Sequence, residues 1–165
     1  MLLLLMRHGI AEPLAEPDAD DAARPLSAKG HKRTAQVAQG LATLVPRLDV
    51  LASSPKLRAR QTAMLAHAAL AHPPRLEWDE LLLETDFAPL LKRLSKSGAE
   101  TVLLVGHEPN LSRLVAWLLT GDEAGMALDF KKAGVCALEF KWQDKKPRAT
   151  LLWLLPPRTL RRLRP

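Results

Sequence analysis

The sequence lacks the features on which disulfide-linked, metal-binding and membrane-spanning proteins depend. Cys136 is the single cysteine among 165 residues, which excludes an internal disulfide and a cysteine-rich metal site and fits a reducing compartment. No set of ligand side chains stands at metal-site spacing. The apolar run at residues 2–6 is too short for a signal peptide or a membrane span, and no basic segment precedes it. We therefore expect a cytoplasmic protein that needs no metal or cofactor and does not contact a membrane.

Aromatic residues are also scarce, at 4% of the chain. The basic stretch at residues 158–164 could form a short helix that contacts nucleic acid or acidic protein, but no aromatic residue interleaves it, which argues against such a role. The formal charge of +6 favours anions in general. Lys131 and Lys132 either extend a positive rim or lie in a solvated loop. The length fits one domain spanning residues 1–165.

Apolar runs and helical periodicity predict the elements of the chain. Residues 2–6 have the pattern of a strand buried on both faces, although periodicity alone does not exclude a helix. An acidic, proline-containing segment at residues 11–21 indicates a mobile, solvated loop. Further strands are expected at residues 49–52, 76–78, 101–105, 134–142 and 149–155. Helices are expected from an N-cap at Ser27 to about residue 45 and at residues 56–70, 87–94 and 111–119.

The first of three chemical signals is Arg7-His8-Gly9, at the carboxyl end of the first predicted strand. Open α/β sheets bind ligands at this end of their strands, and Gly9 removes a side chain that would block a close backbone approach. Arginine offers a planar fork of donors for phosphate, and histidine can be a nucleophile, an acid/base or a metal ligand. The alternative is an ordinary surface turn.

The other two signals also follow predicted strands. Arg58 falls in the first turn of a helix, where anions are favoured, and shares a face with Thr62, whereas Arg60 points away and is expected to be solvated. His107, within Gly106-His107-Glu108-Pro109, repeats the first pattern. Taken singly, Arg58 could be a surface arginine and His107 a structural histidine. Three strand ends that all deliver phosphate-capable side chains favour a common site.

These motifs, together with Arg24-Pro25-Leu26-Ser27 and Gly30, resemble the histidine phosphatase superfamily, the phosphoglycerate-mutase-like enzymes. The resemblance covers most of the chain, and the short length, the Gly-His-Glu-Pro form and the absence of a large lid resemble its SixA-type phosphohistidine phosphatases. It implies an α/β fold, a three-layer α/β/α sandwich around a mixed, mostly parallel sheet.

The resemblance also implies roles for the motif residues. His8 matches the nucleophile that becomes a phosphohistidine, and Arg7, Arg58 and His107 match the phosphate pocket. Gly9 and Arg24 join Arg7 and Arg58 as expected substrate-binding residues. Cationic donors around His8 would stabilise the transferred group and disfavour protonation of the imidazole, so that no metal is required.

The proton donor is where the sequence departs from the family, because residues 79–86 do not match its glutamate motif. Glu80 and Glu84 are the candidate donors, with Asp86 beside them. A weak acid site favours phosphohistidine, whose imidazole leaves more easily than an alcohol. We therefore predict a metal-independent phosphatase acting on phosphohistidine in a protein of the histidine-containing phosphotransfer type. The alternatives are a phosphomonoesterase for small phosphorylated metabolites and a non-catalytic binder of phosphoproteins or nucleic acid.

Overall fold

A computed structural model describes residues 1–14, 16, 18, 20–70, 75–81, 86–143 and 146–164. Its strands are β1 (Leu2–Arg7), β2 (Val50–Ser53), β3 (Arg75–Glu77), β4 (Thr101–Gly106), β5 (Val135–Gln143) and β6 (Lys146–Leu155). Its α-helices are α1 (Ala28–Leu44), α2 (Leu57–Ala69), α3 (Phe87–Lys96), α4 (Asn110–Thr120) and α5 (Pro157–Leu163), and two 3-10 turns, η1 (Asp21–Ala23) and η2 (Asp79–Leu81), complete the set. None of these helices is long and apolar enough to cross a membrane.

All six strands form one sheet in the order β3-β2-β4-β1-β5-β6. The first four strands in this order run parallel, and β5 pairs antiparallel with both β1 and β6. The predicted mixed, mostly parallel sheet is confirmed. The last strand begins at Lys146, earlier than the expected residue 149, because Lys146, Pro147 and Arg148 pair with β5.

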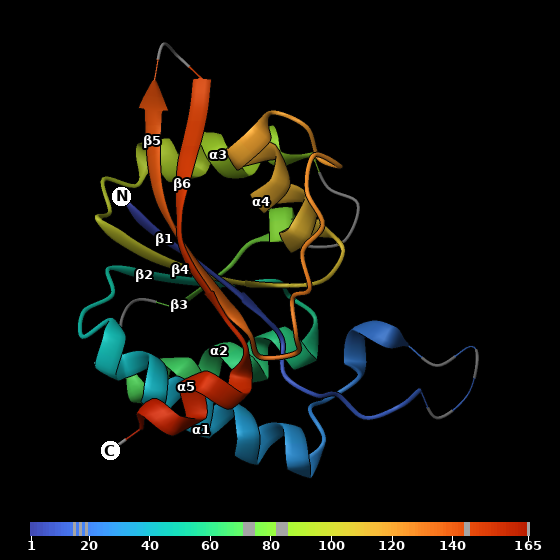
Figure 1. Ribbon diagram of the computed structural model, residues 1–165. Coiled ribbons are helices and arrows are strands. Elements are labelled where there is room, and N and C mark those ends of the chain that lie inside the picture. Colours follow the sequence, from blue (N-terminus) through green and yellow to red (C-terminus); the bar gives the residue numbers. More distant parts are fainter. Residues whose placement is uncertain are drawn as a thin grey trace.

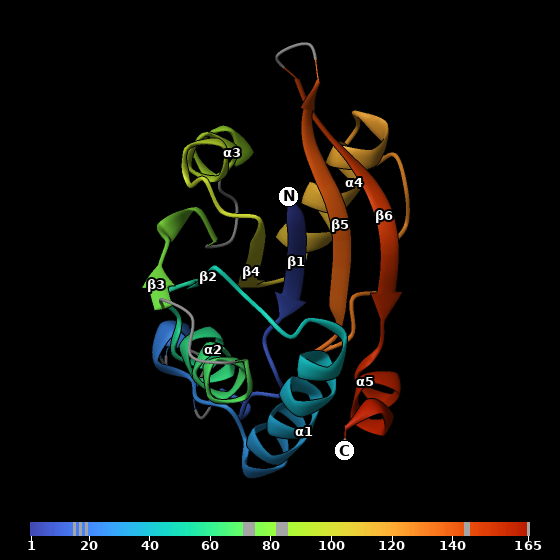
Figure 2. The ribbon, with the colours of Figure 1, turned by 90° about the vertical axis from the view of Figure 1, so that its left-hand side faces the viewer.

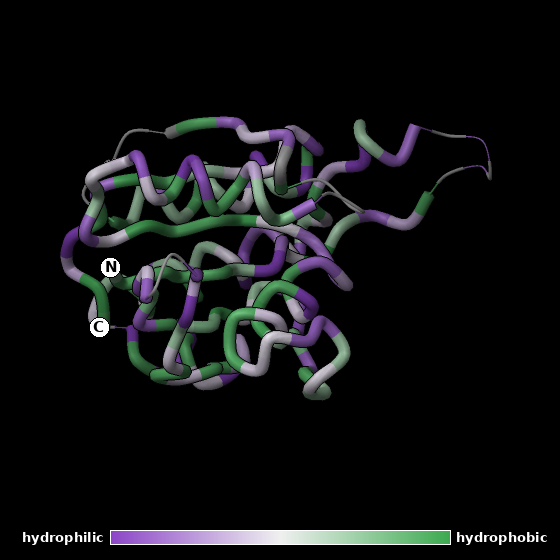
Figure 3. Tube along the Cα trace, turned by 90° about the horizontal axis from the view of Figure 1, so that it is seen from above, coloured by the Kyte–Doolittle hydropathy of each residue, from purple (hydrophilic) through white to green (hydrophobic). Residues whose placement is uncertain are grey.

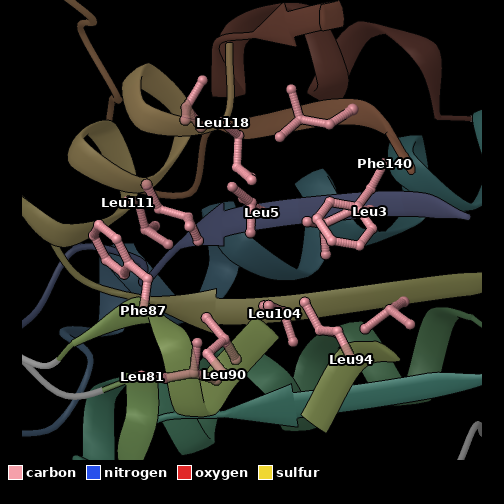
Figure 4. Packing of buried hydrophobic residues seen from close by; sticks show 14 of the residues in the cluster. Leu3, Leu5, Leu81, Phe87, Leu90, Leu94, Leu104, Leu111, Leu118 and Phe140 are labelled. Atoms are coloured by element: carbon pink, nitrogen blue, oxygen red, sulfur yellow. The ribbon is translucent and has the colours of Figure 1, made fainter. Parts of the chain in front are cut away.

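Helices cover both faces of the sheet, with α3 and α4 on one side and α1, α2 and α5 on the other (Figures 1 and 2). Each face has its own buried apolar cluster. Figure 4 shows side chains of β1, β4, α3 and α4 pointing toward one another in the first cluster. Viewed from above, the helices alternate between hydrophilic and hydrophobic residues, while hydrophobic stretches lie in the middle of the molecule (Figure 3). The expected three-layer sandwich is therefore confirmed.

The N-terminal apolar run is the centre of this sheet. Leu3, Leu4, Leu5 and Met6 are fully buried, and β1 lies between β4 and β5 with helices on both faces. Alternate residues enter the two clusters, with Leu3 and Leu5 in one and Leu4 and Met6 in the other. Burial of each such side chain contributes about 1.5–3 kcal/mol. The run is thus a strand buried on both faces, not a helix.

The start of α1 is fixed against the segment that follows β1. Ser27 is the N-cap, as predicted, and its hydroxyl accepts a hydrogen bond from the Gly30 amide (3.0 Å). A β-carbon at residue 30 would lie 1.9 Å from the carbonyl oxygen of Ile10. Gly30 is therefore required for close backbone packing, and this contact holds α1 beside the carboxyl end of β1.

Candidate active site

The carboxyl ends of three neighbouring strands bring the three sequence motifs together. Arg7 is paired with Gly106 in the β1–β4 register, and the His8 amide donates to the Gly106 carbonyl (3.0 Å). On the other side of β4, the Ser54 amide donates to the Val105 carbonyl (3.0 Å). His8, His107 and the start of α2 consequently lie at one edge of the sheet, where open α/β folds bind ligands.

His8 is held with one ring nitrogen available for reaction. Its Nδ1 lies 2.7 Å from the Gly9 carbonyl oxygen, and because a carbonyl only accepts, Nδ1 carries the proton and Nε2 keeps its lone pair. Burial lowers the pKa of His8 to about 4; the Gly9 hydrogen bond opposes this, and the charges of Arg58, Arg7 and Lys132 add to the lowering. The imidazole is therefore neutral at physiological pH and can attack an electrophile.

His107 faces His8 across the site. The two ring centroids are 5.1 Å apart with an interplanar angle of 52°. His107 Nε2 lies 2.8 Å from Ser54 Oγ, and its Nδ1 is buried without a hydrogen-bond partner. Burial lowers the pKa of His107 to about 3, with His8, Arg58 and Lys56 adding to the effect. A neutral His107 whose Nε2 accepts from the Ser54 hydroxyl would present an Nδ1–H donor to a ligand.

Arg7 and Arg58 are both held by backbone oxygens. Arg7 donates from one terminal nitrogen to the Phe130 carbonyl (2.7 Å), and Arg58 donates to the Asp21 carbonyl (2.7 Å). The Nε–H of each guanidinium is buried and has no partner. With His107 Nδ1, these groups are three buried nitrogens with no partner among the described residues, and the Nε of Arg24, beside Asp21, is a fourth. The cost of leaving a buried donor unpaired, about 1–3 kcal/mol, is recovered when an anion fills the site.

Gly9 and Thr62 set the local backbone. The Gly9 amide donates to Thr62 Oγ1 (3.0 Å), whose hydroxyl donates to the Arg58 carbonyl (2.7 Å). A β-carbon on residue 9 would lie 2.2 Å from Thr34 Oγ1, so a side chain of α1 occupies the space that glycine leaves open. The shared face of Arg58 and Thr62 is as predicted, and it links α2 to the nucleophile segment.

The prediction for Arg60 is also confirmed. Its side chain is 52% exposed and pairs with Glu77 (3.0 Å), whereas the side chain of Arg58 is 4% exposed. Arg60 therefore lies outside the site.

Asp21 is a site residue that the sequence analysis missed. The segment at residues 11–21 was expected to be solvated, but the Asp21 carboxylate pairs with Arg58 (2.9 Å), Lys56 (2.7 Å) and Arg24 (2.9 Å). Hydrogen bonding from Lys56 and Arg58 holds the pKa of Asp21 well below its usual range. The expectation is wrong here because ion pairs between segments that are distant in the sequence leave no local pattern. The sequence indicated only that a carboxylate lies in a loop that follows a strand end.

Arg24, an expected substrate-binding residue, joins the site through Asp21. It also donates to the Glu12 carbonyl (3.4 Å), and its buried Nε has no partner. The structure therefore places Arg24 next to the Asp21–Arg58 pair, with Asp21 between the two arginines.

The structure describes the side chain of only one of the three candidate proton donors, Asp86. Glu84 lies outside the described residues, and of Glu80 only the backbone, in η2, is described. Asp86 is exposed and serves as the N-cap of α3, accepting from the Ala88 amide (3.0 Å).

Glu108 is a further carboxyl group, which the sequence analysis did not single out. It follows His107, and its Oε2 accepts from Ser112 (2.5 Å), while Oε1 is buried without a partner. Burial raises the pKa of Glu108, and the Arg7 charge partly opposes this. A carboxyl group that follows His107 in the sequence therefore holds its proton more tightly than an ordinary glutamate.

The site can therefore hold a tetrahedral anion against an unprotonated imidazole. Arg7, Arg58 and His107 each have an unpartnered buried nitrogen, and His8 Nε2 keeps its lone pair. Across the described ranges, no three His, Cys, Asp or Glu side chains gather as metal ligands. The arrangement suits phosphoryl transfer, in which fixed cationic donors stabilise charge on the transferred group.

Known proteins are similar to this chain in sequence and in fold. A family model described as the histidine phosphatase superfamily (branch 1) matches residues 3–100. An uncharacterised protein of Picosynechococcus sp. is 37% identical over 141 residues, 84% of either chain. Phosphohistidine phosphatase SixA of Escherichia coli is 28% identical over 165 residues, 98% of this chain and 97% of that protein. A solved structure of the protein histidine phosphatase SixA complexed with tungstate has a TM-score of 0.82 at 26% identity, covering 97% of this chain and 99% of that one. The resemblance inferred from the motifs is confirmed.

Proposed function

The chain belongs to the histidine phosphatase superfamily (branch 1), and on that basis we propose that it hydrolyses phosphohistidine carried on a protein, through a covalent phosphohistidine at His8. The observation that supports this most directly is the set of three unpartnered buried nitrogens beside the free Nε2 of His8. A phosphoryl group offers three equatorial oxygens, which matches donors on Arg7, Arg58 and His107. In this proposal the positive charge comes from side chains, and no metal ion is needed.

The first step transfers the phosphoryl group to the enzyme. The lone pair of His8 Nε2 attacks phosphorus, and the bond from phosphorus to the substrate imidazole breaks. The substrate ring takes up a proton from solvent at its other nitrogen, and the leaving imidazole then keeps the bonding pair and departs neutral. Free imidazole titrates near ~6.5, so this leaving group needs little help from an enzyme acid.

The second step releases phosphate. A water oxygen attacks phosphorus, the bond to His8 Nε2 breaks, and the imidazole recovers its lone pair. The water gives up a proton to solvent, and inorganic phosphate leaves the site. The Nδ1–H of His8 stays on the Gly9 carbonyl throughout, which keeps the same tautomer ready for the next cycle.

Two comparisons favour phosphohistidine as the substrate. The relative named phosphohistidine phosphatase SixA aligns over nearly all of both chains. The solved SixA structure holds tungstate, a tetrahedral oxyanion of the same charge class as phosphate. A pocket built for such an oxyanion is what the donors on Arg7, Arg58 and His107 would provide here.

Trapping the intermediate tests the proposal. A peptide carrying ³²P-phosphohistidine is mixed with the protein and the reaction is stopped in alkali, in which phosphohistidine is stable. Wild type is expected to hold an acid-labile label, and His8→Ala is expected to hold none. His31→Ala, which removes an exposed histidine from α1, is the matched control and should label like wild type. Equal labelling of His8→Ala and wild type would show that His8 is not the nucleophile.

A phosphomonoesterase for small metabolites is the second candidate, and Glu108 is the observation that favours it. An alkyl phosphate needs an acid to protonate its leaving oxygen, and a carboxyl group with a raised pKa beside the pocket can provide one. Glu108→Gln keeps the shape but removes the acid. If small esters are the substrates, this variant should lose about 100-fold in their turnover, in line with general acid catalysis. If phosphohistidine is the substrate, its hydrolysis should change less than about threefold, because the substrate imidazole can be protonated from solvent near neutral pH and does not depend on Glu108.

A further inference from the structure

Two helices beside the site carry positive charge and no negative charge. The sequences of α1 and α5 contain no aspartate or glutamate. Their exposed or half-buried cations are Lys29, Lys32, Arg33, Arg158, Arg161 and Arg162. The two helices lie side by side in both ribbon views and contact each other extensively (Figures 1 and 2). Arg33 of α1 and Arg161 of α5 line the same cavity, and we call the cations of the two helices the α1–α5 surface.

A small cavity lies between the α1–α5 surface and the segment that follows β1. Arg33, Arg161 and Lys132 line this cavity of about 40 Å³ together with Ile10 and Ala133. Ile10 follows the nucleophile motif by two residues, and the amide of Ala133 donates to the carbonyls of Arg7 and His8 (both 3.1 Å). The charge of Lys132 acts on His8 itself. These three cations thus line one cavity next to the segment that follows His8.

The three cations are available to an outside partner. Within the part of the chain that the structure describes, no carboxylate lies within ion-pair distance of Arg33, Lys132 or Arg161, whereas Lys131 pairs with Asp129 (2.6 Å). The one recorded bond among the three is from Arg161 Nε to the carbonyl of Pro157 (3.3 Å). Neighbouring like charges without counter-ions produce a positive potential that an acidic surface would relieve.

We propose that the α1–α5 surface docks an acidic face of the protein that carries the phosphohistidine. This inference rests on the proposed function, since it assigns the region of contact next to the pocket that receives the phosphoryl group. Protein is favoured over RNA because neither α1 nor α5 contains a phenylalanine, tyrosine or tryptophan on which bases could stack. The surface also lies next to the segment that follows β1. A protein that delivers its phosphohistidine to His8 would contact this region, whereas an unrelated ligand would not need to.

The expected effect is on capture of the substrate. Exposed charges contribute little each to a bound complex, but a surface of one sign increases the rate of encounter with an oppositely charged partner, and salt weakens the effect. We therefore expect about a tenfold gain in kcat/KM for an acidic substrate at low ionic strength. The gain should fall toward none at about 0.5 M salt.

Two phosphohistidine peptides of equal length test the proposal, one with aspartate and glutamate around the phosphohistidine and one with serine and glycine. Wild type should prefer the acidic peptide by about tenfold in kcat/KM at low salt. Arg33→Glu/Arg161→Glu should lose this preference while hydrolysing free phosphohistidine at the wild-type rate. Lys92→Glu/Lys96→Glu is the matched control, because it reverses two exposed charges on α3, which covers the opposite face; it should keep the preference.

The outcomes separate this inference from the proposed function. Failure of wild type to hydrolyse either peptide or free phosphohistidine would reject the proposed function. Hydrolysis of both peptides with equal kcat/KM, or a preference that survives in Arg33→Glu/Arg161→Glu, would reject the docking surface alone. A 15-nucleotide RNA that binds wild type more tightly than the acidic peptide, and loses binding in the double variant, would assign the surface to nucleic acid instead.

Discussion

At the scale of single residues, the site combines well-anchored side chains with unused donors. Arg7 is anchored on Phe130, and His107 contacts Ser54, so their orientations are set before a ligand arrives. Arg58 is anchored on Asp21 through both terminal nitrogens, which leaves its Nε–H for the ligand. Preorganised donors of this kind avoid reorganisation during the reaction, and this is the main source of their catalytic effect.

The two arginines of α2 give a direct test of this arrangement. Arg58→Ala is expected to lower kcat/KM by about 100- to 1000-fold, because it removes a buried donor from the phosphate site. Arg60→Ala should change kcat/KM less than about twofold, since Arg60 is exposed and its ion pair with Glu77 contributes little. The measurement is steady-state hydrolysis of a phosphohistidine peptide. Similar losses in the two variants would contradict the placement of Arg58 in the site.

How far the site could be predicted varies from residue to residue. His8, Arg58 and His107 follow strands with clear apolar patterns, so their meeting at one sheet edge could be expected from the order of elements. Asp21 could not be predicted, because it reaches Arg58 from an irregular segment without periodicity. The raised pKa of Glu108 arises from its burial in the folded protein. Burial cannot be predicted from the motif that contains Glu108, so the raised pKa could not be predicted either.

At the scale of elements, the position of α1 depends on one close contact. The Ile10 carbonyl occupies the space where a residue-30 side chain would be, and the same helix supplies Thr34 against Gly9. A shift of α1 would therefore move the backbone that carries His8. Helix position and nucleophile position are coupled in this fold.

Gly30→Ala tests that coupling. The added methyl group would overlap a backbone oxygen that cannot move freely, so the free energy of unfolding should fall by about 1–3 kcal/mol, and activity should fall with it. Urea denaturation and peptide hydrolysis measure the two effects. His31→Ala changes an exposed neighbour in the same turn and should stay within about 0.5 kcal/mol of wild type. Full stability and activity in Gly30→Ala would show that α1 is free to adjust.

Elements were predicted more completely than their arrangement. The strands and helices lie close to their expected positions, because apolar periodicity is a local property of the chain. The insertion of β4 between β1 and β2 depends on pairings between distant segments, which no local pattern specifies. The mixed sheet was predicted only from the family resemblance. The start of β6 was misplaced for the same reason, since Lys146 and Pro147 are set by pairing with β5.

At the scale of the whole molecule, the site makes stability depend on pH. His8 and His107 are buried as neutral imidazoles, with pKa values lowered from 6.5 to about 4 and about 3. Below pH 6.5 the unfolded chain binds protons at these positions and the folded chain does not. Stability must therefore fall as the pH drops from 6.5 toward 4, and it is recovered as the pH rises. The proposed mechanism requires the same neutral imidazole, since a protonated His8 could not act as a nucleophile.

His107→Gln isolates one of these contributions. Glutamine cannot be protonated in this range, so the variant should lose less stability than wild type between pH 7 and pH 5, by about 2 kcal/mol. The opposite contribution from the raised pKa of Glu108 is common to both proteins, and it cancels when the two are compared. Urea denaturation at the two pH values gives the numbers, with His31→Gln as the control for loss of an exposed imidazole. An identical pH dependence in His107→Gln and wild type would mean that the pKa of His107 is the same in the folded and the unfolded protein, which would contradict its burial as a neutral imidazole between pH 7 and pH 5.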